Sequence, residues 1–218
     1  MVALLYCRSG GGKTVNSTLV KGEKNLLLCS DNSEIVLRNF PRDNLTIKKI
    51  THCVKKDRDD RSAFYETALD EAEQGYTNII IDNLSDLFDM WLLELEEKNA
   101  GSKDRRQDYQ YVYNMLKRIV RKATLFKCNV IFTAWTETRN LVTPDGKPYI
   151  NTMPKLPAKI IDNICGLCNC VGYITHGTGA DGKEVWWYVL KPTKEFYAKD
   201  QLYDRDSWYP ENIFEGKE

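Results

Sequence analysis

The chain has 218 residues, of which 42% are hydrophobic, and its 31 Lys and Arg balance its 31 Asp and Glu. This length suits one domain with a sizeable core, and the zero net charge argues against nucleic-acid binding through overall charge, so any such surface must be local. No apolar run approaches the roughly 18 residues of a membrane helix, so we expect no membrane association. Seven cysteines and a chain that starts in a strand predict a cytoplasmic protein without a signal peptide.

The first predicted strand, Val2–Tyr6, leads into a glycine-rich turn that ends in Lys13 and Thr14. Strand, glycines, Lys-Thr and a segment that can be helical follow one another as in a phosphate-binding P-loop, although Cys7 stands where the usual spacing has glycine. In such a loop backbone N–H groups and a helix N-terminus face the phosphate, Lys13 reaches the terminal phosphates, and the Thr14 hydroxyl holds Mg²⁺. An ordinary flexible turn is the alternative. The predicted nucleotide-binding residues are Ser9, Gly10, Gly11, Gly12, Lys13, Thr14 and Val15.

Short apolar runs alternate with helical patterns along the chain. The predicted strands are Val2–Tyr6, Asn25–Cys29, Leu45–Ile50, Asn78–Ile81, Asn129–Thr133, Cys170–Thr175 and Glu184–Lys191. Helices are predicted over 62–74, 84–95 and 112–123, where apolar residues recur every three or four positions. The first five strands read as a parallel sheet covered by helices, and the last two, joined by a turn over 177–182, as a β-rich C-terminal end. We therefore predict one α/β domain over residues 1–218, with a mostly parallel sheet flanked by helices.

A second candidate for the phosphate site follows the strand 78–81, which ends in Asp82. P-loop enzymes place a carboxylate at such a strand end, where it orients the Mg²⁺ shell. Many α/β strands end in Asp, so the position gains weight only from the P-loop upstream. We predict that Asp82 and Thr14 form the metal site.

Several segments resemble phage RecA-like nucleotide-binding proteins, which include core-only single-strand annealing recombinases. They are Cys7–Thr14, Ile79–Asp82, the stretch from Asp108 to Trp135, Pro154-Lys-Leu-Pro157 and Phe196-Tyr-Ala-Lys-Asp200. The resemblance spans most of the chain. It implies a RecA-type core that binds ATP and Mg²⁺, acts on single-stranded DNA in phage recombination or annealing, and hydrolyses ATP when DNA stimulates it. It also implies assembly with itself into a ring or filament, a single-strand-binding protein as a candidate partner, and the cytoplasm of a bacterial host as its location.

The resemblance also suggests catalytic residues beyond Lys13. The family places a carboxylate after the second strand to orient the attacking water, and Asp31 matches that place, with Glu34 as the second choice. Asp31 could instead cap the next turn. At the end of the fourth core strand, Thr133 or Thr136 would sense the γ-phosphate. Lys199 matches a family segment from which a cation could reach the neighbouring subunit's γ-phosphate, as an arginine finger does.

Two segments match the family's DNA-binding loops, 97–106 and 139–159. Basic residues with an interposed aromatic suit a single strand, because charge tracks the phosphates and a ring stacks on a base. Solvated loops without any partner are the alternative. The predicted nucleic-acid contacts are Lys103, Arg105, Arg106, Arg139, Lys147 and Lys155.

Two other functions fit parts of this pattern. One is a P-loop nucleotide kinase, which would need a second nucleotide pocket and an arginine-bearing lid and would leave Lys199 without a role. The other is a nucleotide-gated annealing module that binds ATP with little hydrolysis. Three departures from the usual motifs favour the annealing module over the kinase: Cys7 replaces a glycine, Asp31 stands where the family more often has Glu, and Trp135 stands at the strand end where the family usually has a polar side chain.

The run Cys165-x-x-Cys168-x-Cys170 could indicate zinc. Structural zinc normally takes four ligands, and a fourth here would have to come from a remote residue. Cysteine is among the most buried residue types, so we predict packing at the start of the next strand and no metal.

Overall fold

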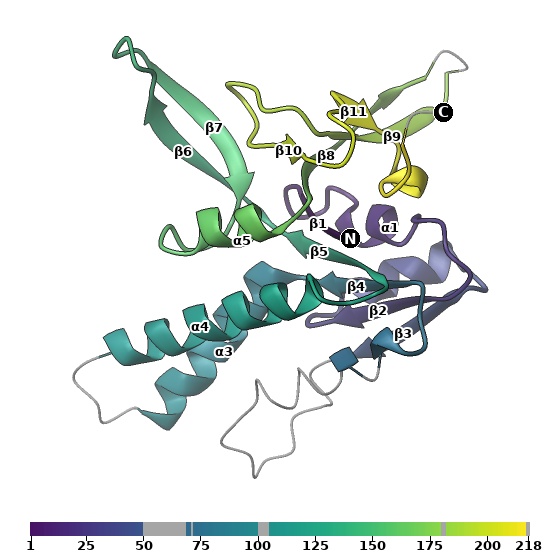
Figure 1. Cartoon of the computed structure of the whole chain (residues 1–218), viewed down its shortest axis with the longest axis horizontal. Helices are drawn as coiled ribbons and strands as arrows, with labels where there is room; N and C mark the ends of the chain where they lie inside the picture. Colours follow the sequence, from purple (N-terminus) through teal and green to yellow (C-terminus); the bar gives the residue numbers. More distant parts are fainter. Residues whose placement is uncertain (50–68, 71, 100–104, 180–181, 217–218) are drawn as a thin grey trace.

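The computed structural model describes residues 1–49, 69–70, 72–99, 105–179 and 182–216. Its main sheet contains β1 (Val2–Tyr6), β2 (Asn25–Cys29), β3 (Leu45–Lys49), β4 (Asn78–Asp82), β5 (Asn129–Ala134), β8 (Cys170–Thr178), β9 (Glu184–Val189), β10 (Lys199–Asp200) and β11 (Ser207–Trp208). The strand order is β11-β9-β8-β1-β5-β4-β2-β3, with β10 also paired to β8 (Figure 1). Strands β1 to β5 and β8 run parallel, and β9, β10 and β11 are antiparallel. The predicted α/β architecture, with its β-rich C-terminal end, is therefore confirmed.

The apolar strands lie between two cores. Strands β1, β2 and β4 are buried at every position, as parallel strands covered on both faces must be. Because side chains alternate along a strand, Leu4 and Tyr6 enter the core that α3, α4 and α5 cover, and Ala3 and Leu5 enter the core next to the C-terminal segment. The helical elements are α1 (Lys13–Ser17), η1 (Ser33–Asn39), α3 (Leu84–Lys98), α4 (Arg106–Ala123), α5 (Ile161–Leu167) and η3 (Pro210–Asn212).

The predicted helices agree with the structure where it describes them. Helix α3 covers the predicted helix at 84–95, and α4 starts before the one at 112–123. Of the helix predicted at 62–74, residues 62–68 and 71 lie outside the described part of the chain, as does residue 50 at the end of the third predicted strand. Among the described residues, none of the helices has the length and apolar character needed to cross a membrane.

The prediction of an irregular loop over 139–159 was wrong in part. Strands β6 (Thr136–Val142) and β7 (Pro148–Pro154) pair as an antiparallel hairpin that stands away from the main sheet (Figure 1). Its tip is a tight turn in which Gly146 has a φ of 80°, and the Thr143 N–H donates to the Lys147 carbonyl. The hairpin is half exposed, so its sequence lacks the continuous apolar run by which the buried strands were recognised.

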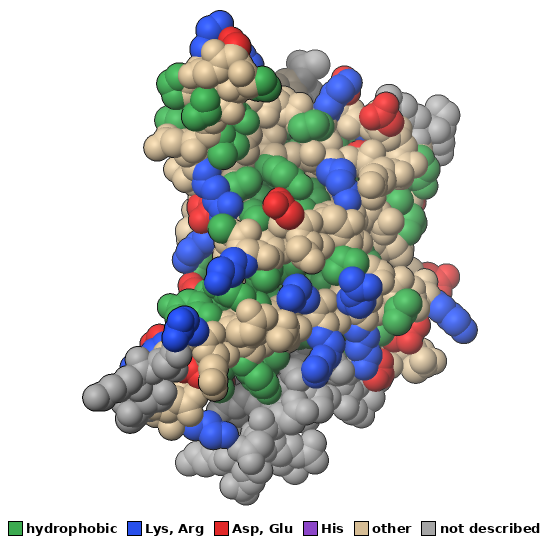
Figure 2. All heavy atoms as spheres, turned by 60° about the vertical axis from the view of Figure 1, so that its left-hand side comes forward, with side chains coloured by type: hydrophobic (Ala, Val, Ile, Leu, Met, Phe, Trp, Pro, Cys, Tyr) green, Lys and Arg blue, Asp and Glu red, His purple; other side chains and the backbone are tan. Residues whose placement is uncertain are grey.

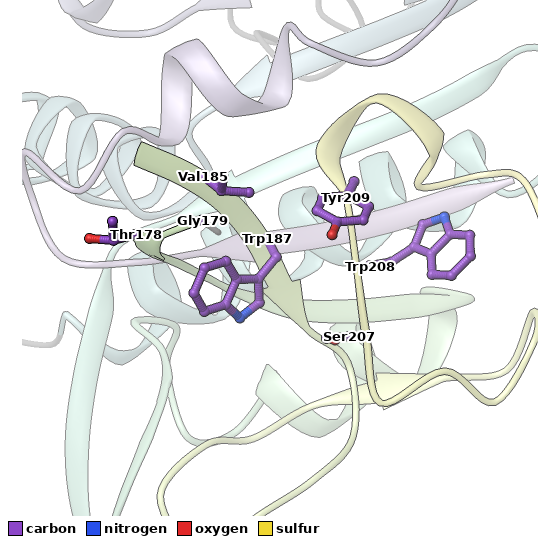
Figure 3. A pocket seen from close by; sticks show the side chains of 7 residues that line it. All are labelled: Thr178, Gly179, Val185, Trp187, Ser207, Trp208 and Tyr209. Carbon is purple, nitrogen blue, oxygen red and sulfur yellow. The ribbon is translucent and has the colours of Figure 1, made fainter. Parts of the chain in front are cut away.

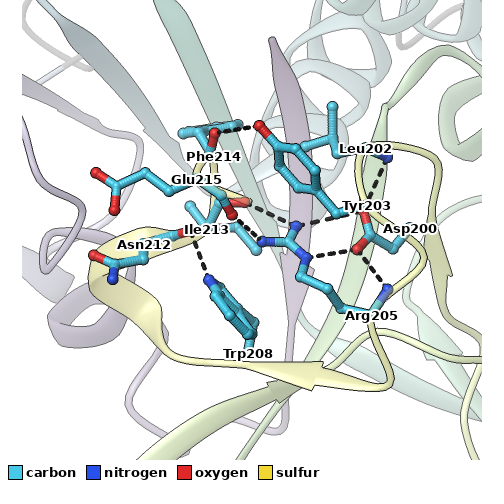
Figure 4. Close-up of polar contacts among 9 residues, drawn as sticks. All are labelled: Asp200, Leu202, Tyr203, Arg205, Trp208, Asn212, Ile213, Phe214 and Glu215. Atoms are coloured by element: carbon cyan, nitrogen blue, oxygen red, sulfur yellow. Dashed lines mark hydrogen bonds and ion pairs between the residues drawn. The ribbon is translucent and has the colours of Figure 1, made fainter. Parts of the chain in front are cut away.

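The C-terminal segment is held to the sheet by one buried side chain, Arg205 (Figure 4). Its guanidinium pairs with Asp200 at 2.6 Å and donates to the carbonyl oxygens of Ile213 and Glu215 at 3.0 and 2.8 Å. A planar fork with five donors suits this arrangement of one carboxylate and two carbonyls. The Lys21 N–H donates to the Glu211 carbonyl, so the fold of the C-terminus also fixes the segment that follows α1.

Candidate functional site

The loop between β1 and α1 requires its glycines. Gly10 and Gly12 have φ angles of 73° and 77°, which residues with a side chain rarely adopt. A Cβ on Gly11 would lie 2.8 Å from the Cys7 sulfur and 3.0 Å from the Arg8 carbonyl oxygen, closer than real contacts. The backbone therefore forms the tight turn that a phosphate cradle needs, and Gly12 leads directly into α1.

Cys7, the departure from the usual motif, lies inside the core and not in the cradle. It is 1% exposed, and its thiol donates to the Gly11 carbonyl oxygen at 3.0 Å. Burial raises the pKa of this thiol to about 11, so it stays neutral near pH 7. Cys7 thus supports the loop from beneath, a role that its sequence position did not indicate.

Lys13 and Thr14, the two side chains of the loop predicted to bind phosphate and Mg²⁺, lie in the first turn of α1. The Lys13 ammonium is 3.5 Å from the Arg8 carbonyl oxygen, and only 7% of the residue is exposed. The Thr14 hydroxyl donates to the Asp82 carboxylate at 2.5 Å. The flanking Ser9 is exposed and Val15 is half-buried. The P-loop threonine and the acid at the end of β4, predicted from separate motifs, therefore meet.

Asp82 receives hydrogen bonds from three hydroxyl groups. Besides Thr14, Ser33 at the start of η1 donates to Oδ2 at 2.9 Å, and Thr133 at the end of β5 donates to Oδ1. Asp82 is 1% exposed, so these donors fix its orientation away from bulk water. The hydroxyls come from three segments that meet at the carboxyl edge of the sheet. From the sequence, Thr133 was predicted only as a sensor of the γ-phosphate. Ser33 was not predicted at all, because the short polar segment around it matches no motif.

The donor set around Asp82 fits Mg²⁺. Hydroxyl and carboxylate oxygens are its preferred protein ligands, and Mg²⁺ usually takes few of them and keeps several waters. Within the described residues, no group of three or more His, Cys, Asp or Glu is placed to hold a metal. Thr14 and Asp82 are the residues that would hold the ion.

Asp31 lies beside this group, and its carboxylate already has partners. One oxygen accepts the Ser33 N–H at 2.8 Å, which is the turn-capping role considered for it, and the other is 3.4 Å from the Asn83 side-chain nitrogen. Glu34, the second choice, forms an ion pair with Lys49 at 2.5 Å. Asp31 is therefore linked to Asn83, the residue that follows Asp82, whereas Glu34 is held towards β3.

The structure adds a carboxylate that the sequence did not single out, Asp86 in the first turn of α3. Burial raises its pKa, a hydrogen bond with Ser30 opposes this, and the negative charges of Asp31, Asp89 and Asp82 raise it further. The Asp86 N–H donates to the Asn83 side chain at 2.8 Å, so Asp86 lies close to the strand end that carries Asp82.

Lys199 lies on β10, which pairs with β8, the strand next to β1. Its ammonium donates to the carbonyl oxygens of Cys165 and Gly166, 2.9 and 3.2 Å away, at the C-terminal end of α5. In the sheet Lys199 pairs with Val171 of β8, and Val171 in turn pairs with Leu4 of β1. Leu4 lies two residues before Tyr6, where β1 ends and the P-loop begins. Lys199 is thus directed at the end of a helix, where a cation is favourable, and not at the phosphate cradle of its own chain.

The cysteines near Lys199 are part of the core. Cys165, Cys168 and Cys170 are fully buried. Burial raises the pKa of Cys165 and of Cys170 to about 12, as expected for thiols packed among apolar side chains.

Strand β9 packs directly on the P-loop. A Cβ on Gly12 would lie 2.8 Å from the ring of Trp186, which also stacks on His176 with ring centroids 4.6 Å apart. The Tyr188 hydroxyl donates to the Asn16 carbonyl oxygen of α1 at 3.1 Å. The C-terminal strands therefore form one wall of the phosphate site, so disturbance of the C-terminal segment is expected to reach α1.

A hollow of about 630 Å³ opens beside β9 and β11 (Figure 3). Its lining residues are Thr178, Gly179, Val185, Trp187, Ser207, Trp208 and Tyr209. Because side chains alternate along β9, Trp187 points to the opposite face from Trp186, which contacts the P-loop. This hollow is thus separate from the phosphate site.

The predicted nucleic-acid residues on the β6–β7 hairpin have acidic partners. Arg139 pairs with Glu137, and Lys147 at the tip pairs with Asp145 at 2.9 Å. Lys155, at the base, is 3.3 Å from Asp89. Arg139 and Lys155 share a hollow of about 480 Å³ between the hairpin base and α3, and Lys147 is remote from it.

The other predicted loop lies only partly within the described structure. Lys103 falls outside the described residues. Arg105 pairs with Glu96 of α3 at 3.1 Å, and Arg106 is the exposed first residue of α4. The two described cations of this segment, Arg105 and Arg106, therefore lie next to helices α3 and α4.

Residues 1–202 match the protein family described as AAA domain. Among curated proteins, none matches the sequence. A KaiC-like protein from the hyperthermophilic archaeon Pyrococcus horikoshii has a similar fold, with a TM-score of 0.51 at 12% identity, covering 86% of this chain and 77% of the other. This likeness supports the RecA-like P-loop fold.

Two weaker structural likenesses carry no argument. The flagellar accessory protein FlaH of Methanocaldococcus jannaschii gives a TM-score of 0.40 at 13% identity, covering 86% of this chain and 76% of FlaH. The P4 protein of bacteriophage phi6 in complex with ADP gives 0.35 at 14% identity, covering 85% of this chain and 56% of P4.

Proposed function

We propose, from the premise that the chain belongs to the AAA-domain family of P-loop proteins, that it binds ATP with Mg²⁺, hydrolyses the ATP, and acts on single-stranded DNA as a phage recombination or annealing protein. The observation that carries the nucleotide part is the meeting of Thr14, Thr133 and Ser33 at the Asp82 carboxylate, beside the cradle of glycines. Such an arrangement suits a polyphosphate and a hard cation, which supports the proposal.

The chain's own residues supply most of what phosphoryl transfer needs. Backbone N–H groups at the start of α1 would bind the β- and γ-phosphates, and the Lys13 ammonium would exchange the Arg8 carbonyl for a phosphate oxygen. Mg²⁺, when bound by Thr14 and Asp82, neutralises phosphate charge. Positioning and charge neutralisation dominate catalysis of this reaction, so a fixed carboxylate and a fixed lysine are its main requirements.

Asp31 remains the proposed group that orients the attacking water. Its link to Asn83 keeps it next to the metal-binding strand end, whereas Glu34 is engaged by Lys49. One oxygen of Asp31 already accepts the Ser33 N–H, so the carboxylate has less freedom to turn towards an attacking water. We therefore expect slow hydrolysis.

DNA binding is supported by local charge in a neutral protein. Helix α4 has five basic residues and one acid, so its own sequence gives it a positive balance. Basic surfaces that include aromatic rings favour single strands. Figure 2 shows Lys and Arg side chains gathered across the middle of one face, with few acids among them.

Assembly into a ring or filament is the last part of the proposal. Lys199 would serve the neighbouring subunit's γ-phosphate, and to do so its ammonium would leave the carbonyl oxygens at the end of α5. A head-to-tail contact of this kind repeats until it closes or grows.

One experiment tests the proposed function. ATP hydrolysis is measured with and without single-stranded DNA, at several protein concentrations. We expect a slow rate that DNA stimulates and that rises more than linearly with protein concentration. Phosphate transfer to an added nucleotide would indicate a kinase, and DNA binding that ATP modulates without hydrolysis would indicate an annealing module.

A further inference from the structure

A second hollow, of about 490 Å³, lies at the start of α4. It is lined by Arg106, Gln107, Tyr109, Gln110, Tyr113 and Lys159. Five of these residues come from the first turns of α4, and Lys159 comes from the segment before α5. The two segments predicted from sequence to contact DNA, 97–106 and 139–159, each contribute one cation to it.

The helix that forms this hollow is strongly basic. Its basic residues are Arg106, Lys117, Arg118, Arg121 and Lys122, and Lys122 is paired with Asp70. The acid of α4, Asp108, is buried and accepts a hydrogen bond from the Asn99 side chain at 2.6 Å. The solvent side of α4 therefore carries positive charge without exposed acids of its own, although the chain as a whole is neutral.

The aromatic rings of the hollow are held in place from behind. Tyr113 stacks on Phe88 of α3 with centroids 5.9 Å apart and an angle of 16° between ring planes. Tyr109 meets the edge of Tyr113 at 6.2 Å and remains 38% exposed. Rings fixed in this way lose little conformational entropy when a flat ligand stacks on them.

We propose that this hollow binds single-stranded nucleic acid, with a base stacked on the exposed Tyr109 ring, which Tyr113 supports edge-on, and the flanking phosphates at Arg106 and Lys159. The inference rests on the proposed function, whose DNA-binding part it localises. Gln107 and Gln110 carry amide groups that can hydrogen-bond base edges. An acidic peptide would use the two cations but would leave the aromatic rings without a purpose, so the nucleic acid accounts for more of the lining.

The first test compares two tyrosines of the same helix. Binding of a fluorescein-labelled oligo-dT is measured by anisotropy for wild type, Tyr109→Leu and the control Tyr111→Leu. Tyr111 is 41% exposed, much like Tyr109, but does not line the hollow. Loss of one base–aromatic stack is worth about tenfold in affinity, so Tyr109→Leu should bind about tenfold more weakly and Tyr111→Leu like wild type. Equal affinities of the two variants would overturn the proposal.

The second test separates stacking from charge. An oligonucleotide with abasic sites should bind wild type about as weakly as oligo-dT binds Tyr109→Leu. If wild type binds both oligonucleotides equally, the hollow is only an anion site and the stacking is refuted. Arg106→Gln and Lys159→Gln should each lower the slope of log affinity against log salt by about 0.7. The matched control Arg121→Gln should change it less. An equal change in all three would place the phosphate contacts elsewhere.

Failure here is distinguishable from failure of the proposed function. Tyr109→Leu should keep wild-type ATP hydrolysis without DNA, because Tyr109 lies outside the phosphate site. If wild type binds DNA and the two tyrosine variants do not differ, only the hollow is refuted. If wild type binds no DNA with ATP and Mg²⁺ present, the DNA part of the proposed function is refuted as well.

Discussion

Replacement of Arg205 by methionine should destabilise the protein more than most single substitutions. Arg205 is 1% exposed, and its guanidinium lies between the rings of Tyr203 and Trp208 (Figure 4). The guanidinium carbon Cζ is 4.8 Å from the centroid of the Tyr203 ring and 5.3 Å from that of the Trp208 ring. Methionine roughly fills the volume but leaves the buried Asp200 carboxylate and two carbonyl oxygens without their donor. Removing one partner of a buried ion pair costs about 3–5 kcal/mol.

This cost should depend on pH in a defined direction. Burial raises the pKa of Asp200, but hydrogen bonds from the Arg205 side chain and backbone outweigh it, and the pKa lies below its usual value. A folded-state pKa below the unfolded one means that Asp200 stabilises the fold above about pH 4 and that this contribution is lost as the pH falls through the folded pKa. In Arg205→Met the Asp200 carboxylate stays buried without its partner, so its pKa rises above the usual value. Protonation of Asp200 at low pH then removes the unpaired charge and reduces the loss of stability in the variant. The unfolded states of the two proteins titrate alike, so the stability difference between wild type and variant should be largest near neutral pH and should shrink as the pH falls from the raised pKa of the variant to the lowered pKa of wild type.

Urea unfolding followed by tryptophan fluorescence measures this difference, since Trp208 contacts the guanidinium. A loss of about 4 kcal/mol corresponds to a fall of roughly 8–16 °C in Tm for a domain of this size. Asp200→Asn in the Arg205→Met background should recover part of the loss, because it removes the unpaired charge. Lys191→Met, which breaks an exposed ion pair with Asp206, should leave stability unchanged. A loss below about 1 kcal/mol in Arg205→Met, or one that does not vary with pH, would refute the reasoning.

The remaining predictions concern the phosphate site. Lys13→Ala should abolish ATP binding measured by calorimetry, because the backbone cradle alone leaves the terminal phosphate charge unpaired; equal affinity would contradict the P-loop assignment. Thr133→Val removes one hydroxyl from Asp82 and should weaken the Mg²⁺-dependent part of ATP binding, with binding in EDTA unchanged. Asp31→Asn should keep ATP affinity and lower turnover by about 10²-fold, while Glu34→Gln leaves it near wild type; the reverse result would identify the other carboxylate as the base. Lys199→Ala should keep ATP affinity but lose ATP-dependent assembly and turnover, and mixing it with Lys13→Ala protein should restore part of the activity. Turnover proportional to protein concentration throughout, with a monomer in light scattering, would contradict the shared site.

Strand positions were predictable because the core strands are buried on both faces. A parallel strand covered by helices leaves a continuous apolar run, and the predicted bounds of β1 and β2 coincide with the observed ones. The hairpin β6–β7 was not predictable in this way, because one of its sides faces solvent and its polar residues resemble those of a loop. Its pairing depends on the tight turn around Gly146.

By itself, the sequence determined the local chemistry of the site: a strand, three glycines and Lys13-Thr14 in order, and an acid at the end of a buried strand. These are properties of short segments, in which backbone freedom and apolar pattern are set by neighbouring residues. Only the tertiary structure decided which groups meet. The contact of Asp82 with Ser33 and Thr133, the two carbonyls that hold Lys199, and the hollow that joins α4 to Lys159 all link segments far apart in the chain. Such contacts follow from strand order and packing, which no short segment encodes.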